Sequence, residues 1–473
     1  MQLIDQTESH NPETEKFPWK LGLTLYSLSY LPMMLFSKAY FWDDWYVYKL
    51  KDSEYRALLR EAGSSPVRAW IEIGMLDANP VLFRIVTILS YFAVGWFLFH
   101  ILSNVRFIGA HYVRIVTLLF LILPINSARV SMINFFYSYS LLSFYFAWYL
   151  LVTNKSVVGR LASIPLFLIS FAALSPLIFF IIPCCHLGYL MYLNPNVKKI
   201  HVALIPLALL SIAPLYYIVD RRFNPPLGGY ADYYSPALVG IAFASLFLIA
   251  CAIATSIHFY RHRSDLVDVM PISLLIVGVD VVAIGASPYM VGGHFQTLSE
   301  WMLDFVPGSS DWHSRHQLLL GLGFAILITG LLACTQDKFR RYLLFLVISI
   351  CVLLNMNFMN SYYLDYLKQN EIIAQFRSSA LLSNSKVLMI DDKADLFNAR
   401  GRSYRIYEWN GMLDEAFGSS NITTAMHFSY VRRGDELVPD TLVTISSRNL
   451  RIAATLKREV GIEISVQLIS PHG

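Results

Sequence analysis

The sequence predicts an all-α polytopic membrane bundle of about 11 transmembrane helices, followed by a small C-terminal extracytoplasmic α/β domain. Three observations predict this fold class. The 473 residues are 56% hydrophobic and 15% charged, with a mean hydropathy of +0.49, whereas soluble domains carry about 25% charged residues. The apolar residues gather in runs of about 20, the length with which a helix crosses a bilayer. After residue 358 the runs shorten and alternate with polar turns, as in a mixed α/β domain.

Most of the apolar runs predict one membrane-spanning helix each. We expect these spans at 19–38, 81–103, 110–125, 134–153, 201–219, 236–257, 268–286, 316–335 and 341–358. The stretch 161–193 is too long for one span and short for two. Because Ser175-Pro176 and Pro183 interrupt it, it predicts two short or broken helices that turn near Ser175. The transmembrane domain therefore covers residues 19–358.

Basic residues in alternate short loops determine the predicted orientation. These residues are Arg106, Arg114, Lys155, Arg160, Lys198, Lys199, Arg261, Arg263, Lys338, Arg340 and Arg341. The positive-inside rule places them in the cytoplasm with the N-terminal tail 1–18, in which we find no signal-peptide pattern. They share one side only if 161–193 crosses twice. The outer face of the cytoplasmic (inner) membrane then holds 39–80, 126–133, 220–235, 287–315 and the C-terminal domain 371–473.

The first outer loop, 39–80, contains the stretch Phe41-Trp42-Asp43-Asp44-Trp45. Aromatic rings mark the membrane–water boundary, and carboxylates there are costly unless they are hydrated, paired or used in chemistry. Two neighbouring carboxylates raise the pKa of one of them, which suits proton abstraction from a sugar hydroxyl. Asp43 and Asp44 could instead form half of a Mg²⁺ or Mn²⁺ site, or a solvated acidic pair that ends a helix. Amphipathic helices are expected along the interface at 53–62 and 67–76.

Several outer-face residues are candidates for binding the phosphate of a lipid carrier, since Arg binds phosphate through a bidentate fork. These candidates are Arg315, His313, His316, Arg221, Arg222 and Arg129. The alternative for each is a helix-end anchor or a contact with a lipid headgroup. The spacing of Asp311, His313 and His316 is not diagnostic of a metal site. Asp280 lies inside an apolar span, where an ionisable residue has either a functional role or a partner on a neighbouring helix.

The C-terminal domain is expected to contain short strands and helices. We expect strands at 386–390, 441–445 and 462–466, and helices at 372–382, 411–417 and 448–459. The five cysteines lie in apolar spans, so neither a disulfide framework nor a thiolate metal site is indicated. Phosphate-binding loops, dinucleotide-binding glycine patterns and the zinc-protease and hydrolase motifs are missing from the sequence. Nothing in it supports binding of nucleic acid.

The sequence resembles the GT-C superfamily of membrane glycosyltransferases, which use polyprenyl-phosphate-linked sugars. The resemblance rests on the acidic motif after the first span, the large first outer loop, the many spans and the extracytoplasmic C-terminal domain. It implies inverting transfer to a surface glycan or lipid-glycan. In that reaction Asp43 or Asp44 deprotonates the acceptor hydroxyl, with Trp42 and Trp45 beside them, and polyprenyl phosphate leaves. The resemblance implies no certain cofactor. The charge of the leaving phosphate has to be stabilised by a cation, and Arg315, His313 or Arg221 could take this role.

Two other classes of protein stay open. A glycan polymerase or ligase of the O-antigen type would rely on basic outer-loop residues instead of the acidic pair. A lipid-glycan transporter or flippase would show internal repeats and charged residues in several spans. The sequence shows no repeat, and charge inside the spans is nearly confined to Asp280.

Overall fold

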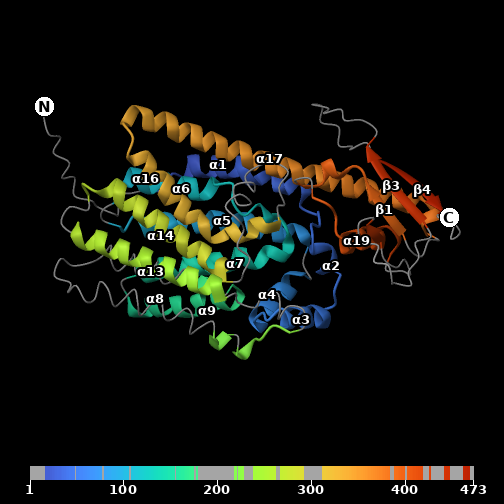
Figure 1. Cartoon of the computed structure of the whole chain (residues 1–473), viewed down its shortest axis with the longest axis horizontal. Helices are drawn as coiled ribbons and strands as arrows, with labels where there is room; N and C mark the ends of the chain where they lie inside the picture. Colours follow the sequence, from blue (N-terminus) through green and yellow to red (C-terminus); the bar gives the residue numbers. More distant parts are fainter. Residues whose placement is uncertain are drawn as a thin grey trace.

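A bundle of long helices forms one end of the molecule and a small sheet forms the other (Figure 1). The structure is a computed structural model. It describes residues 16–47, 49–76, 79–105, 108–154, 156–174, 177–178, 218–220, 222–227, 238–262, 267–291, 312–383, 388–399, 402–418, 425–427, 441–447 and 462–468.

Five of the described helices are long and apolar enough to cross a membrane. They are α5 (Pro80–Leu102), α7 (Phe135–Thr153), α13 (Leu238–Arg261), α14 (Met270–Val291) and α17 (Asp337–Ser378). Each coincides with a span predicted from hydropathy, because about 20 apolar residues can satisfy all their backbone hydrogen bonds in lipid only as a helix. The start of α5 also follows the sequence, since the Asn79 side chain accepts a hydrogen bond from the Val81 N–H, and Pro80 occupies the first turn.

Other apolar segments form shorter helices. They are α1 (Trp19–Tyr30) with the 3₁₀ helix η2 (Leu31–Phe36), α6 (Ala110–Ile122), α8 (Val157–Leu161) with α9 (Ser163–Ala173), and the 3₁₀ helix η5 (Trp312–Leu320) with α16 (Gly321–Ala333). The 13 residues of α6 and of α16 extend about 20 Å each, short of the roughly 30 Å hydrocarbon core. The predicted span 201–219 and the second half of 161–193 lie almost entirely outside the described residues.

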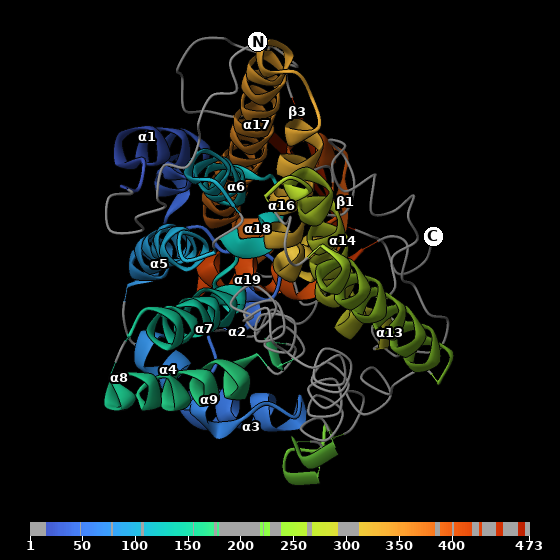
Figure 2. The same ribbon diagram turned by 90° about the vertical axis from the view of Figure 1, so that its left-hand side faces the viewer.

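Glycines allow neighbouring helices of the bundle to approach closely. A Cβ atom on Gly278 of α14 would lie 2.7 Å from the Leu327 backbone of α16, and one on Gly323 would lie 2.6 Å from Val282. Small residues at helix contacts are typical of membrane bundles, because dispersion between closely packed backbones drives association there. Figure 2 shows α14 between α16 and α13, with α13 at the edge of the bundle.

The first outer loop folds into three helices, α2 (Asp44–Val47), α3 (Asp52–Glu61) and α4 (Pro66–Leu76). The last two match the predicted amphipathic helices. Glu72 joins them, since its buried carboxylate accepts hydrogen bonds from the Tyr55 hydroxyl and from Arg68 Nε at 3.0 Å. The helices of this loop therefore form one packed unit.

Helix α17 has 42 residues and extends about 63 Å, twice the thickness of a hydrocarbon core. It continues without a break into the C-terminal domain, so no flexible linker separates the domain from the last span. The helices α18 (Ala380–Ser383), η6 (Asp395–Phe397) and α19 (Ile406–Phe417) follow it. The described part of the domain also contains a four-stranded sheet of order β2-β1-β3-β4.

The strands of this sheet are β1 (Leu388–Asp392), β2 (Ala425–His427), β3 (Thr441–Ser447) and β4 (Ile462–Leu468). Strand β1 is parallel to β2 and β3, with Leu388 opposite Ala425 and Thr441. Strands β3 and β4 are antiparallel, with Thr441 opposite Leu468. The three predicted strands are confirmed, the three-residue β2 is an addition, and the predicted helix 448–459 lies outside the described residues.

The core of the C-terminal domain includes one residue of the first outer loop, Trp45. Its indole is 3% exposed and packs against α19, where a Cβ on Gly411 would lie 2.7 Å from the ring. The sequence predicts Trp42 and Trp45 as interfacial aromatics, but both are buried. Because these rings are buried, the first outer loop and the C-terminal domain share one packed interior.

Candidate functional site

Trp42 has a left-handed backbone conformation, with φ of 51°. This region is costly for a bulky residue, and such strain persists only where surrounding contacts impose it. The Trp42 ring meets the Tyr362 ring at a centroid distance of 5.8 Å, and the Arg402 guanidinium lies 5.0 Å from its centroid. Contacts with α17 and with the C-terminal domain therefore hold the turn that carries Asp43 and Asp44.

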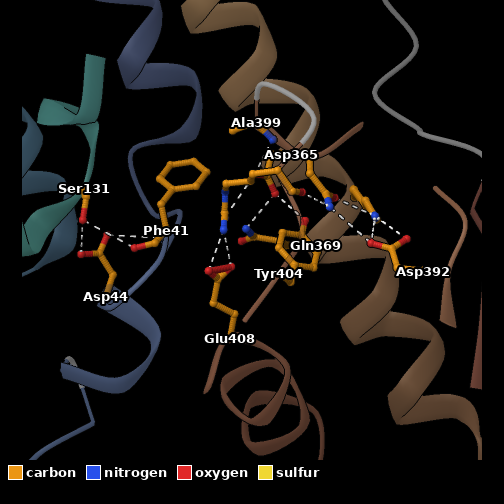
Figure 3. A network of polar contacts seen from close by, with 12 residues as sticks. Phe41, Asp44, Ser131, Asp365, Gln369, Asp392, Ala399, Tyr404 and Glu408 are labelled. Carbon is orange, nitrogen blue, oxygen red and sulfur yellow. Dashed lines mark hydrogen bonds and ion pairs between the residues drawn. The ribbon is translucent and has the colours of Figure 1, made fainter. Parts of the chain in front are cut away.

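The two adjacent aspartates have different surroundings. Asp44 is 1% exposed and accepts hydrogen bonds from Ser131 Oγ at 2.7 Å and from the N–H groups of Ile133, Met132 and Phe41 at 2.8, 3.0 and 3.1 Å (Figure 3). Burial raises the pKa of this carboxyl, while the nearby Arg84 and these hydrogen bonds oppose the rise. Asp44 therefore anchors the first outer loop to the segment 131–133.

Asp43 is only half-buried and faces the C-terminal domain. The Tyr407 hydroxyl of α19 donates a hydrogen bond to its carboxylate, and burial together with Asp43 raises the Tyr407 pKa. Glu408, the next residue of α19, lies close enough for the Asp43 charge to affect its pKa. Asp43 is thus the member of the acidic pair that retains access to solvent.

Behind Asp43 lies a buried ion pair. Arg402 Nη1 donates to both oxygens of Glu408 at 2.6 and 2.7 Å, and Arg402 Nη2 lies 3.5 Å from Asp365 Oδ2. Glu408 is fully buried, and burial raises its pKa to about 7 although Arg402 opposes the rise. The pair places a titratable carboxyl next to Asp43.

Asp365 of α17 connects this ion pair to the membrane bundle. It is fully buried and accepts hydrogen bonds from the Tyr404 hydroxyl, from the Ala399 N–H at 2.8 Å and from Gln369 Nε2 at 2.9 Å (Figure 3). One carboxylate in the C-terminal third of α17 therefore holds the segment that presents Arg402.

Lys368 joins the same helix to the sheet. Its ammonium donates to Asp392 at 2.6 and 2.8 Å, to Asn398 Oδ1 at 2.7 Å and to the Ala394 carbonyl at 3.0 Å. Besides Glu408, whose pKa is about 7, the network and its neighbour Asp43 contain three carboxylates, those of Asp365, Asp392 and Asp43, against the two cations Lys368 and Arg402, so negative charge exceeds positive charge. Such a site favours hydroxyl donors and cationic groups over anions.

The predicted phosphate contacts do not all gather at this site. Arg129 is buried inside the bundle, Arg315 is half-buried in η5 and Arg222 is exposed on a short helical segment. Arg221 and the side chains of His313 and His316 lie outside the described residues.

Asp280 lies in the middle of α14 and is 4% exposed. Thr255 of α13 lies near its carboxyl, but the Thr255 hydroxyl has no hydrogen-bond partner among the described residues, so the pairing of Asp280 with a neighbouring helix stays a prediction. In the described ranges, no three His, Cys, Asp or Glu side chains form a cluster that could hold a metal ion. Asp43 and Asp44, which the sequence suggested as half of a metal site, have different environments.

The sequence prediction missed the residues that α17 and the C-terminal domain supply. They are Asp365, Lys368, Asp392, Arg402, Tyr404, Tyr407 and Glu408. A signal was available, because Asp365, Lys368, Gln369 and Ile372 have the helical spacing of one face that continues from Tyr362. Polar residues on the buried face of a helix indicate a network, since buried charges need partners.

Comparison of this chain with family models, with curated proteins and with solved structures finds no match. The resemblance to the GT-C superfamily therefore stays an expectation, which rests on the predicted architecture and the acidic motif. The chemistry has to follow from the residues around Asp43.

Proposed function

We propose that the protein is an integral-membrane glycosyltransferase of the GT-C type. It would move a sugar from a polyprenyl-phosphate-linked donor to an extracytoplasmic glycan or lipid-glycan acceptor. About 11 spans would place the chain in the cytoplasmic (inner) membrane, with Asp43 and the C-terminal domain on the outer face. Two features support this proposal. The chain has helices long enough to cross a membrane, and Asp43 lies between these helices and a domain that contains a sheet.

The observation that carries the proposal is the division of roles within the acidic pair. Asp44 has its oxygens occupied by four donors, so it cannot approach a substrate without breaking them. Asp43 is only half-buried and therefore suits the role of general base. It takes the proton of the acceptor hydroxyl as that oxygen attacks the anomeric carbon. The bond from this carbon to the phosphate oxygen breaks with inversion, and polyprenyl phosphate leaves with the electron pair.

The C-terminal domain would contribute to acceptor recognition. Its residue Tyr407 lies next to Asp43 and offers a hydroxyl to a polyhydroxylated acceptor, while Glu408 behind it is fully buried. The ion pair with Arg402 fixes the orientation of Glu408. Because negative charge predominates, this side of the site fits acceptor hydroxyls better than the donor phosphate.

The test is transfer of radiolabelled sugar from polyprenyl-phosphate donors in membranes, with Asp43→Asn compared with wild type at matched expression. Loss of a general base lowers the rate by roughly 100-fold or more. The matched control is Asp52→Asn, which changes an exposed aspartate of the same loop and should transfer normally. Transfer by Asp43→Asn at the wild-type rate would reject Asp43 as the base.

The same assay separates the other two classes. A polymerase or ligase of the O-antigen type would lose activity when basic outer-loop residues such as Arg222 or Arg315 are changed, while Asp43→Asn stays active. A transporter would move labelled lipid across the bilayer without forming a new glycosidic bond.

A further inference from the structure

The backbone turn that carries Asp43 is strained. Trp42, the residue before it, has a left-handed conformation with φ of 51°. This conformation brings Cβ too close to the following carbonyl oxygen, so a bulky residue leaves it unless other contacts hold it there. Because Asp43 follows directly, the direction of its carboxylate depends on the turn at Trp42.

Arg402 of the C-terminal domain supplies such a contact. Its guanidinium carbon lies 5.0 Å from the centroid of the Trp42 ring, within the range of a cation–π interaction. Trp42 is 4% exposed and the Arg402 side chain is 7% exposed. Tryptophan is the aromatic residue that attracts cations most strongly, and the attraction is largest where water is excluded. This contact therefore holds the ring, and with it the backbone of the turn.

Arg402 is itself fixed in place. Its Nη1 donates to both Glu408 oxygens at 2.6 and 2.7 Å, and its Nη2 lies 3.5 Å from Asp365 Oδ2. Asn398 Nδ2 donates to the Arg402 carbonyl at 2.7 Å. A planar guanidinium can donate hydrogen bonds along its edge and stack on a ring with its face, which the ammonium of lysine cannot do. The two carboxylates therefore orient the group that contacts Trp42.

The contacts of Arg402 join three elements that meet at this turn. They reach Trp42 in the first outer loop, Asp365 in α17 and Glu408 in α19. An ion pair that only stabilised the C-terminal domain would need no contact with the outer loop. The position of Arg402 therefore links the docking of the domain to the geometry of the turn that carries Asp43.

We propose that Arg402 is a positioning residue, which holds the turn at Trp42 and thereby aims the Asp43 carboxylate at the acceptor hydroxyl. Arg402 acts through the Trp42 ring and not on the reacting atoms. The inference rests on the proposed function, because the acceptor hydroxyl belongs to that reaction. The C-terminal domain is then part of the catalytic unit, since one of its residues sets the geometry of the general base.

The first test compares variants in the transfer assay, with kcat and the KM for the acceptor measured at matched expression. Arg402→Met should lower kcat roughly 10- to 100-fold, because a catalytic group displaced by about 1 Å loses that much, while KM stays within about twofold. Arg402→Lys keeps a cation near the Trp42 ring and should retain part of the lost rate. The matched control is Arg377→Met, which changes an exposed arginine paired with Glu415 of α19 and should transfer normally.

A double-mutant cycle tests whether Arg402 acts through Trp42. Trp42→Leu removes the ring and should lower kcat by a similar factor. If the two residues act as one unit, Arg402→Met combined with Trp42→Leu should lower kcat no further than the stronger single change. Effects that multiply would overturn the proposal, because they would show that Arg402 acts independently of Trp42.

A further variant separates positioning from stability. Arg402→Met leaves the buried carboxylate of Glu408 without its partner, so it can unfold the domain. Arg402→Met combined with Glu408→Gln removes the ion pair as a whole, a change that is often neutral for stability. The combined variant should regain the Tm of wild type but not its kcat. Recovery of kcat together with Tm would show a purely structural role and overturn the proposal.

Labelling of Asp43→Cys with a charged, membrane-impermeant thiol reagent reports on the turn without any sugar transfer. Arg402→Met should raise the rate of labelling severalfold as the turn relaxes, and Arg377→Met should leave the rate unchanged. The chain without Asp43→Cys gives the background of the native cysteines. Equal rates of labelling with and without the Arg402 guanidinium would contradict the proposal.

The labelling assay and the transfer assay can fail separately. Labelling that depends on Arg402 in a protein that transfers no sugar would retain the positioning of Asp43 and reject the transferase. Transfer that depends on Asp43, with labelling and kcat that ignore Arg402, would retain the transferase and overturn the positioning role.

Discussion

Asp44→Ala tests the structural role of the buried aspartate. The change removes the acceptor of one hydroxyl, of the buried N–H groups of Phe41 and Met132, and of the partly buried N–H group of Ile133. It also removes the carboxylate nearest to Arg84, which is 1% exposed. We therefore expect a loss of stability far larger than a surface substitution causes.

The magnitude follows from these contacts in two ways. Each buried donor left without a partner costs about 1–3 kcal/mol, and two of the three backbone groups are buried. Arg84 also loses the nearby negative charge of Asp44, which adds to the cost because an uncompensated buried charge is destabilising. The two effects overlap and relaxation recovers part of them, so we expect a loss of about 4 kcal/mol in the free energy of unfolding. At roughly 2–4 °C per kcal/mol, Tm falls by about 10 °C.

The measurement is thermal unfolding of the purified protein in detergent, followed by the monodisperse fraction after heating. Asp43→Asn is the internal comparison and should keep Tm within about 2 °C, since its half-buried side chain accepts from Tyr407 and from no backbone donor of segment 131–133. If Asp44→Ala were as stable as wild type while Asp43→Asn unfolded early, the assignment of anchor and base would be reversed.

Two further predictions concern the C-terminal domain. Gly411→Ala places a Cβ 2.7 Å from the Trp45 ring, so it should lower the free energy of unfolding by about 1–3 kcal/mol and speed proteolysis of the domain. The control Gly74→Ala, whose Cβ would meet no atom within 4 Å, should do neither. Equal rates of proteolysis for the two variants would contradict this prediction. The pKa of Glu408 is about 7 in the folded protein and about 4.5 in the unfolded chain, so protonation of Glu408 stabilises the folded state. This stabilisation is complete below about pH 4.5 and is lost as the pH rises through 7. Between these two values the free energy of unfolding falls by about 1.4 kcal/mol per pH unit. Glu408→Gln should therefore flatten the dependence of Tm on pH, and curves parallel to wild type would refute the raised pKa.

Local patterns were sufficient to predict much of the architecture. The spans at 81–103, 134–153 and 268–286, the loop helices α3 and α4, and the three longer strands all follow from hydropathy or periodicity within about 20 residues. The number of crossings in 161–193 stays a prediction, because most of that stretch lies outside the described residues.

The sequence alone could not decide the details of the site. In Asp43-Asp44 it shows two equivalent carboxylates, and only the contact with Ser131, 87 residues away, makes one of them an anchor. It likewise shows Trp45 as one more interfacial aromatic, although α19 buries it.

The sequence by itself determined the long apolar helices, the two amphipathic helices of the first outer loop, the three longer strands and the acidic motif, because hydropathy and periodicity act between near neighbours. Tertiary structure alone decided which carboxylate stays accessible, which C-terminal residues surround it and that Arg129 is buried inside the bundle. Burial, pKa and ion pairing depend on groups that are distant in the chain and meet only after folding.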